Sequence, residues 1–147
     1  MKTVVIQNEP LLTEVARLVS EGERVSLRTK GSSMLPFITG GRDSVILVKP
    51  ETVKVNDIVL ARVSTGNIVL HRVVSVEGET LTLMGDGNIC GCESCRRADV
   101  MAKAVAIVRN DRTVDCTSPA HVFKARVWRM LKPLRRYLLA VYRRITK

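Results

Sequence analysis

Between residues 25 and 116, short segments rich in Val, Ile and Leu alternate with turns that contain Gly, Asn or Asp. Hydrophobic residues make up 46% of the chain but aromatic residues only 3%, so the core must be aliphatic, and β-branched side chains favour strands. A connection such as Ser64-Thr65-Gly66-Asn67 is typical of a hairpin. The pattern predicts a mainly β fold, a coiled and largely antiparallel sheet or partial barrel. The expected strands are 25–29, 44–48, 58–63, 68–76, 80–84, 101–109 and 112–116.

One helix is expected before these strands. Asn8 can cap a helix whose first turn contains Pro10, and apolar residues follow at helical spacing as far as Val19. Glu21-Gly22 then ends the helix, because glycine is a natural terminator. Residues 4–6 are expected to form a short strand or a lead-in.

A length of 147 residues suits one domain with an appendage. We expect a body formed by residues 1–118, with its core in 25–116, and a basic helical tail formed by residues 119–147. The net charge of +10 is concentrated in that tail. Nine of the 24 Lys and Arg residues and none of the 14 acidic residues lie in 121–147, which leaves residues 1–120 with a net charge of +1.

The near-neutral body argues against a nucleic-acid partner, because a general nucleic-acid-binding face needs a concentration of basic residues. A DNA-binding repressor is not expected either. Only one helix precedes the strands, which leaves no room for a helix-turn-helix domain.

Apolar residues of the tail recur at helical spacing, with most of the basic residues elsewhere on the helix and Pro133 placed to kink or divide it. The recurring set is Phe123, Val127, Leu131, Leu134, Leu138, Val141 and Ile145. A basic amphipathic helix can lie on an anionic membrane surface, or it can pack on the body with its basic face in solvent. The sequence leaves both arrangements open for residues 121–147.

No window of eighteen uncharged apolar residues occurs, so we expect no transmembrane helix. The apolar run of residues 1–6 is too short for a signal peptide and is followed by Asn8 and Glu9. We therefore expect a cytoplasmic protein that could be peripheral on the inner face of the membrane.

A small-residue turn, Gly31-Ser32-Ser33-Met34-Leu35-Pro36-Phe37, connects two of the expected strands. Glycine and serine allow close approach of another molecule, Met34 and Phe37 can anchor the turn in apolar surface, and Pro36 stiffens its exit. The turn is suited to hold a serine nucleophile, although an ordinary serine-rich loop has the same composition.

Two further stretches could complete a catalytic site. His71 falls inside an expected strand and shares a face with Val69 and Val73, where an apolar environment keeps imidazole neutral and able to accept a proton. Arg72, on the opposite face, is expected to be solvated or paired. Asp86 lies between two glycines after a strand and could orient the base, although Asp-Gly is also a common turn former.

Together these stretches resemble the signal-peptidase-like and SOS-repressor-like serine peptidases over residues 25–109. The turn at 31–36 resembles the nucleophile box, Val55-Asn56-Asp57-Ile58-Val59 the G-D-I-V strand box, and Gly85-Asp86-Gly87-Asn88 the G-D-x-N box. His71-Arg72-Val73 is similar to the archaeal and endoplasmic-reticulum type, which has a histidine where bacterial signal peptidases and SOS-type repressors have a lysine.

The resemblance implies a partial barrel of the signal-peptidase and SOS-repressor peptidase type. It also implies that Ser33 is the nucleophile, His71 the general base and Asp86 the supporting acid, with Asp99 a weaker candidate for a second acid. The implied function is a serine endopeptidase that cleaves a peptide or precursor protein without a cofactor. The alternative is a non-catalytic or regulatory peptidase-like binding module, acting at a membrane surface or on a partner protein.

The chain departs from the family pattern at several points. Gly31 stands where many members have a serine that can line the oxyanion hole, so the backbone N–H of Ser33 and the Ser32 hydroxyl would have to serve. Asn56 replaces the glycine of the G-D-I-V box, which would alter only a turn. Signal peptidases also carry a membrane anchor, and no anchoring segment is expected here.

Four cysteines, Cys90, Cys92, Cys95 and Cys116, could form a closed tetrahedral zinc site. The paired C-x2-C spacing usual for such sites is missing, however, and Cys116 belongs to a separate expected strand. Free thiols in a loop are therefore expected in preference to a metal site, and a disulfide is disfavoured in the cytosol.

Overall fold

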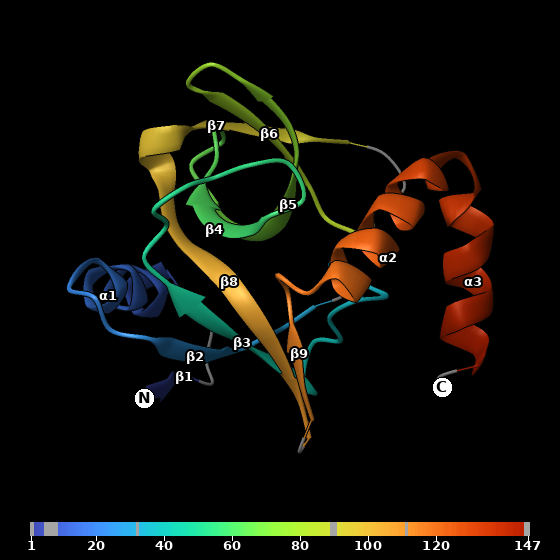
Figure 1. The fold of residues 1–147 in the computed structure, drawn as a ribbon, viewed down its shortest axis with the longest axis horizontal. Helices are drawn as coiled ribbons and strands as arrows, with labels where there is room; N and C mark the ends of the chain where they lie inside the picture. Colours follow the sequence, from blue (N-terminus) through green and yellow to red (C-terminus); the bar gives the residue numbers. More distant parts are fainter. Residues whose placement is uncertain (1, 5–8, 32, 89–90, 111, 146–147) are drawn as a thin grey trace.

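The computed structural model describes residues 2–4, 9–31, 33–88, 91–110 and 112–145. Within these ranges the fold is mainly β, with nine strands and three α-helices (Figure 1). The strands are β1 (Lys2–Val4), β2 (Val25–Arg28), β3 (Asp43–Val48), β4 (Ile58–Arg62), β5 (Ile68–Glu77), β6 (Thr80–Met84), β7 (Glu93–Arg96), β8 (Val100–Arg109) and β9 (Arg112–Asp115). The helices are α1 (Glu9–Ser20), α2 (Pro119–Met130) and α3 (Arg135–Ile145), with short 3-10 turns η1 (Arg97–Asp99) and η2 (Lys132–Leu134).

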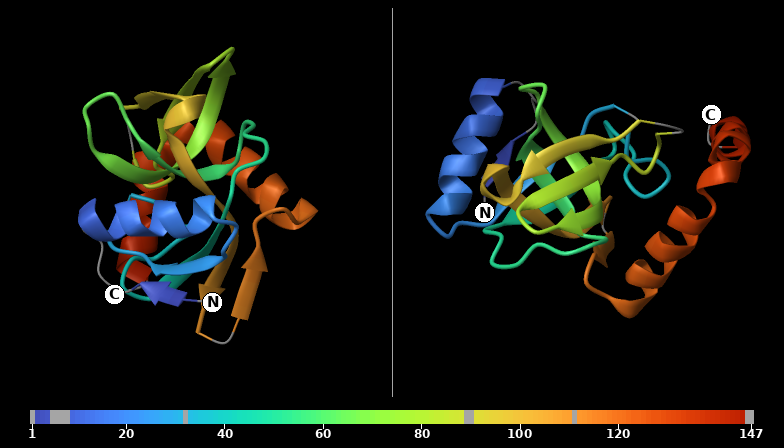
Figure 2. Two further views of the ribbon diagram at one scale, coloured as in Figure 1. Left: turned by 90° about the vertical axis from the view of Figure 1, so that its left-hand side faces the viewer. Right: turned by 90° about the horizontal axis from the view of Figure 1, so that it is seen from above.

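The strands form one sheet in the order β1-β2-β3-β8-β4-β5-β6-β7, with β9 paired to β8. Every pair is antiparallel except β1 with β2. Register shifts interrupt the pairing of β8 with both of its main neighbours, β3 and β4, and such bulges increase local twist. The sheet curls into a half-barrel, which confirms the predicted coiled, largely antiparallel architecture (Figures 1 and 2).

The expected strands and the first helix match the structure to within a few residues. α1 ends before Gly22, whose φ of 93° is the left-handed conformation typical of a helix C-terminus. β7 is the exception, because a cysteine-bearing loop was expected at its position. Only one of its four side chains, that of Cys95, is buried, and the segment is a strand because its backbone pairs with β6. β1 covers residues 2–4, and residues 5–6 of the expected lead-in lie outside the described ranges.

Two hydrophobic clusters form the core. The larger one lies between α1 and the sheet and contains Val15 and Val19 of the helix, both fully buried. The smaller one lies within the β4–β7 part of the sheet, around Val59 and Leu83. α1 and the α2–α3 pair lie on opposite sides of the sheet (Figure 2). Of the three helices, α1 is therefore the one that packs on the larger cluster.

The tail forms two helices rather than one. Ser118 caps α2 by accepting a hydrogen bond from the His121 N–H, and Pro119 occupies the first helical position. Pro133 lies in η2, which separates α2 from α3, as expected for a residue that cannot continue a helix. Among the described helices, none has the length and apolar character needed to cross a bilayer.

Candidate active site

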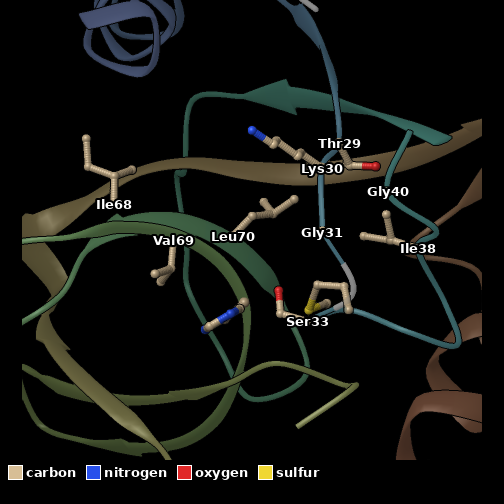
Figure 3. Close-up of a pocket in the computed structure, with 11 residues that line it drawn as sticks. Thr29, Lys30, Gly31, Ser33, Ile38, Gly40, Ile68, Val69 and Leu70 are labelled. Atoms are coloured by element: carbon tan, nitrogen blue, oxygen red, sulfur yellow. The ribbon is translucent and has the colours of Figure 1, made fainter. Parts of the chain in front are cut away.

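Ser33 and His71 line the same cavity, which has a volume of about 180 Å³. One wall is formed by residues of the small-residue turn and of the chain on either side of it, and the other by the first residues of β5. Figure 3 shows the Ser33 hydroxyl pointing toward the β5 strand that carries Leu70. The structure thus brings together the two residues that the sequence analysis named as nucleophile and base.

The turn at residues 85–88 supports the small-residue turn that contains Ser33. The Gly87 N–H donates a 2.8 Å hydrogen bond to the carbonyl oxygen of Ser33, and the Asp86 N–H lies 3.4 Å from Sδ of buried Met34. A Cβ atom at Gly85 would overlap the Ser33 carbonyl oxygen, so this close approach requires glycine. The 85–88 turn therefore fixes the position of Ser33 through a backbone hydrogen bond.

The backbone around Ser33 is compatible with an oxyanion hole. Neither its N–H nor its hydroxyl is hydrogen-bonded to another described residue. Gly31 has a φ of 82°, at which a serine would be strained, and this accounts for the absence of a serine at that position. Ser32, the other expected donor, lies outside the described residues.

His71 lies in β5 opposite Val59 of β4 and is 6% exposed. Its Nδ1 is 3.0 Å from Oε1 of Glu93, a contact that becomes an ion pair when the ring is protonated. Burial lowers the pKa of His71 below its ordinary value, against the opposing effect of the Glu93 and Asp86 carboxylates. The ring is therefore neutral near pH 7, as the sequence analysis expected, and can accept a proton.

Asp86 lies in a different arrangement from the one expected for a supporting acid. Its two carboxylate oxygens accept hydrogen bonds of 2.8–3.1 Å from Nε and Nη2 of Arg72. Arg72 is only 2% exposed and also donates to the carbonyl oxygen of Asn56, so it is paired and not solvated. The acid in contact with the His71 ring is Glu93, on β7, and Asp86 acts on that ring only through its charge.

Asn56 occupies a turn at which glycine is favoured. Its φ is 83°, a left-handed conformation that asparagine tolerates better than most residues, so the substitution in the G-D-I-V box preserves the turn. The neighbouring Asp57 accepts from the Lys54 N–H and pairs with Lys103.

Asp99, the weaker acid candidate, does not line the cavity that contains Ser33 and His71. Its carboxylate accepts a 3.0 Å hydrogen bond from the Arg96 N–H at the start of η1. This contact gives Asp99 a role in capping a turn.

The cysteines of the described ranges do not converge on a metal site. Cys92 is exposed, Cys95 is buried in β7, and Cys116 packs against the other core cluster, where burial raises the pKa of its thiol to about 11. No group of three or more metal-ligating side chains forms among the described residues. Cys90, the fourth candidate, lies outside them.

Three residues at the site were not anticipated. Glu93 was missed because it belongs to the unexpected strand β7. Trp128 of α2 donates a 2.7 Å hydrogen bond to the carbonyl oxygen of Asp86, and Arg135 of α3 donates a 3.1 Å hydrogen bond to that of Asn88. A weak signal existed for Trp128, since it is the only tryptophan of the chain.

A scan against protein-family models and a search of curated proteins found no match to this chain.

Proposed function

We propose that this chain is a serine endopeptidase in which Ser33 is the nucleophile and His71 the general base. The observation that carries the proposal is the cavity shared by these two side chains, with Glu93 beside Nδ1 of the imidazole ring. A serine hydroxyl becomes a nucleophile when a neutral histidine accepts its proton and a carboxylate stabilises the charged histidine ring. These three groups are present here. The resemblance to signal-peptidase-like enzymes supports the same assignment.

The mechanism follows from these positions. Ser33 Oγ attacks the carbonyl carbon of the substrate, and its proton passes to Nε2 of His71, while Glu93 stabilises the charged ring at Nδ1. The N–H of Ser33, which has no hydrogen-bond partner among the described residues, is available to the developing oxyanion. His71 then protonates the leaving amine, and a water molecule activated by the same histidine releases the acyl group. A base of this kind contributes roughly a hundredfold to ten-thousandfold to the rate.

The cavity favours an extended peptide as substrate. β6 pairs with β5 only from Arg72 onward, so along residues 68–71 one edge of β5 has no strand neighbour among the described residues. A peptide strand can bind such an edge through main-chain hydrogen bonds. Met34, Ile38 and Leu70 give the cavity apolar surface for a side chain of the substrate.

The test compares the termini of peptides that accumulate in matched cells carrying the native chain, Ser33→Ala or His71→Ala. Both variants should abolish one set of termini, and circular dichroism of the purified proteins should show that both still fold. Ser64→Ala, an exposed hairpin substitution, is the matched control and should behave as the native chain.

Full cleavage by His71→Ala would show that the dyad assignment is wrong. If the termini are the same with Ser33→Ala, the chain does not act as a serine peptidase. The alternative of a peptidase-like binding module would then account for the retained pocket.

A further inference from the structure

The exposed apolar side chains of the protein are concentrated in one region. Among the described residues, every large hydrophobic side chain classed as exposed belongs to α2, η2 or α3. We call this set the C-terminal apolar surface; its members are Phe123, Val127, Met130, Leu134, Tyr137, Leu138, Val141 and Ile145. The body of the protein has no comparable surface within the described ranges.

These side chains lie on helix faces that the fold does not use. α2 buries His121 and Ala125 on the body, whereas Phe123, Val127 and Met130 recur at helical spacing away from these positions. Met130 is 79% exposed, so packing within the chain does not explain its apolar character.

α3 repeats the same arrangement. It buries Arg135 and Leu139, while a second apolar stripe that includes Leu138, Val141 and Ile145 remains exposed. Each helix thus has one buried face and a separate apolar face that the described residues leave exposed.

The C-terminal apolar surface reaches the nucleophile turn. Phe123, Val127 and Leu131 line an apolar groove of about 300 Å³ together with Phe37, four residues after Ser33. The ring of Phe37 also makes an edge contact with the buried His121 ring, which fixes it against α2. The groove therefore joins the tail to the turn that presents the nucleophile.

Charge identifies the partner that this surface fits. Residues 121–147 contain nine basic residues and no acidic residue, and Lys124 lies in the groove itself. A second copy of the chain would bring two such basic segments together, which like-charge repulsion opposes. An apolar face bordered by Lys and Arg is instead the pattern of helices that lie in the interface of an anionic membrane.

We propose that α2, η2 and α3 dock on an anionic membrane surface, with the C-terminal apolar surface in the interface and the basic residues at the lipid headgroups. The cytoplasmic leaflet carries the anionic lipids that this charge favours. Docking would bring the Ser33 cavity close to the bilayer, because Trp128 and Arg135 are hydrogen-bonded to the 85–88 turn that supports Ser33. The proposal does not depend on catalysis.

The test is sedimentation of the full chain with phosphatidylcholine vesicles that contain or lack phosphatidylserine. The native chain should bind the anionic vesicles at least tenfold more tightly than the neutral ones, and added salt should weaken binding. Phe123→Ser combined with Val141→Ser, both at exposed positions, should reduce binding at least tenfold with an unchanged unfolding midpoint.

A charge variant has a matched control elsewhere on the surface. Arg143→Glu with Arg144→Glu should reduce binding at least tenfold, whereas Arg24→Glu with Lys49→Glu changes the net charge equally at exposed body positions and should leave binding within a factor of about two. Equal losses for the two pairs would overturn the proposal, because binding would then depend on net charge alone.

Two other results would also overturn it. One is equal binding to both kinds of vesicle. The other is a dimer in light scattering that Phe123→Ser dissociates, which would show that the surface joins two copies of the chain. Ser33→Ala should bind vesicles as the native chain does, so failure of the proposed peptidase function would remain distinguishable from failure of membrane docking.

Discussion

Asp86→Asn tests whether Asp86 is part of the buried ion pair or acts as the acid of the catalytic site. Asp86 and Arg72 are 4% and 2% exposed, and three hydrogen bonds join the carboxylate to the guanidinium. An amide in place of the carboxylate leaves a guanidinium buried without a counter-charge. Breaking a buried pair in this way typically costs about 3–5 kcal/mol.

Urea unfolding followed by circular dichroism measures this cost. With a slope of about 2 kcal/mol per molar urea, the midpoint should fall by about 1.5–2.5 M. Glu23→Gln makes the same acid-to-amide change at an exposed position and should change stability by less than about 0.5 kcal/mol. Arg72→Met with Asp86→Leu removes both charges and should recover most of the loss, because a buried pair can often be replaced by apolar side chains of similar size.

An unchanged midpoint for Asp86→Asn would refute this reasoning. If that variant also lost cleavage, Asp86 would have to act on His71 directly, as the family resemblance implies. A lower midpoint together with residual cleavage is the result expected if Glu93 orients the base.

Three further predictions concern the site and its surroundings. Burial lowers the pKa of His71 below its ordinary value of about 6.5, so the acid limb of kcat/KM should lie at lower pH than an unperturbed histidine would give, with activity falling as the pH drops through the lowered pKa. Glu93→Gln removes a charge that raises this pKa, and should shift the acid limb to still lower pH while reducing kcat. Gly85→Ala places a methyl group on the Ser33 carbonyl oxygen and should cost about 1–3 kcal/mol in urea unfolding together with most of the cleavage. Because burial raises the pKa of Cys116 to about 11, iodoacetamide at pH 8 should label this thiol at least tenfold more slowly in the folded protein than in urea, as peptide mapping can measure.

The sheet could be predicted from the sequence because its strands carry their own signals. β5, for example, has a run of β-branched residues bounded by turn sequences at 64–67 and around Gly78. β7 has neither length nor apolar character, and only its register with β6 makes it a strand. Such a strand depends on tertiary pairing, which local composition does not reveal.

The same limit applies to the site. Ser33 and His71 belong to stretches whose residue types indicate chemistry, whereas Glu93 comes to His71 only through the position of β7. Asp86 was expected to lie near the site, but its pairing with Arg72 was not expected. Strand alternation places Arg72 on the face opposite His71, and it does not show which residues cover that face. The carboxylate of Asp86, which the sequence pattern assigns to the histidine, is thus hydrogen-bonded to buried Arg72, and the carboxylate of Glu93 contacts His71 instead.

The C-terminal tail differs from the body in charge and composition, but its helices contact the turn that supports Ser33. Charge and composition divide the chain near residue 118, yet the hydrogen bond from Trp128 ends on the carbonyl of Asp86, and the next residue, Gly87, binds the carbonyl of Ser33. These two hydrogen bonds connect α2 to the turn that contains Ser33 through a single short turn, in which Gly85 cannot carry a side chain. A force that moves α2 must therefore act on the position of Ser33, and a membrane that binds the exposed face of α2 would bias the geometry of the cavity as well as its location.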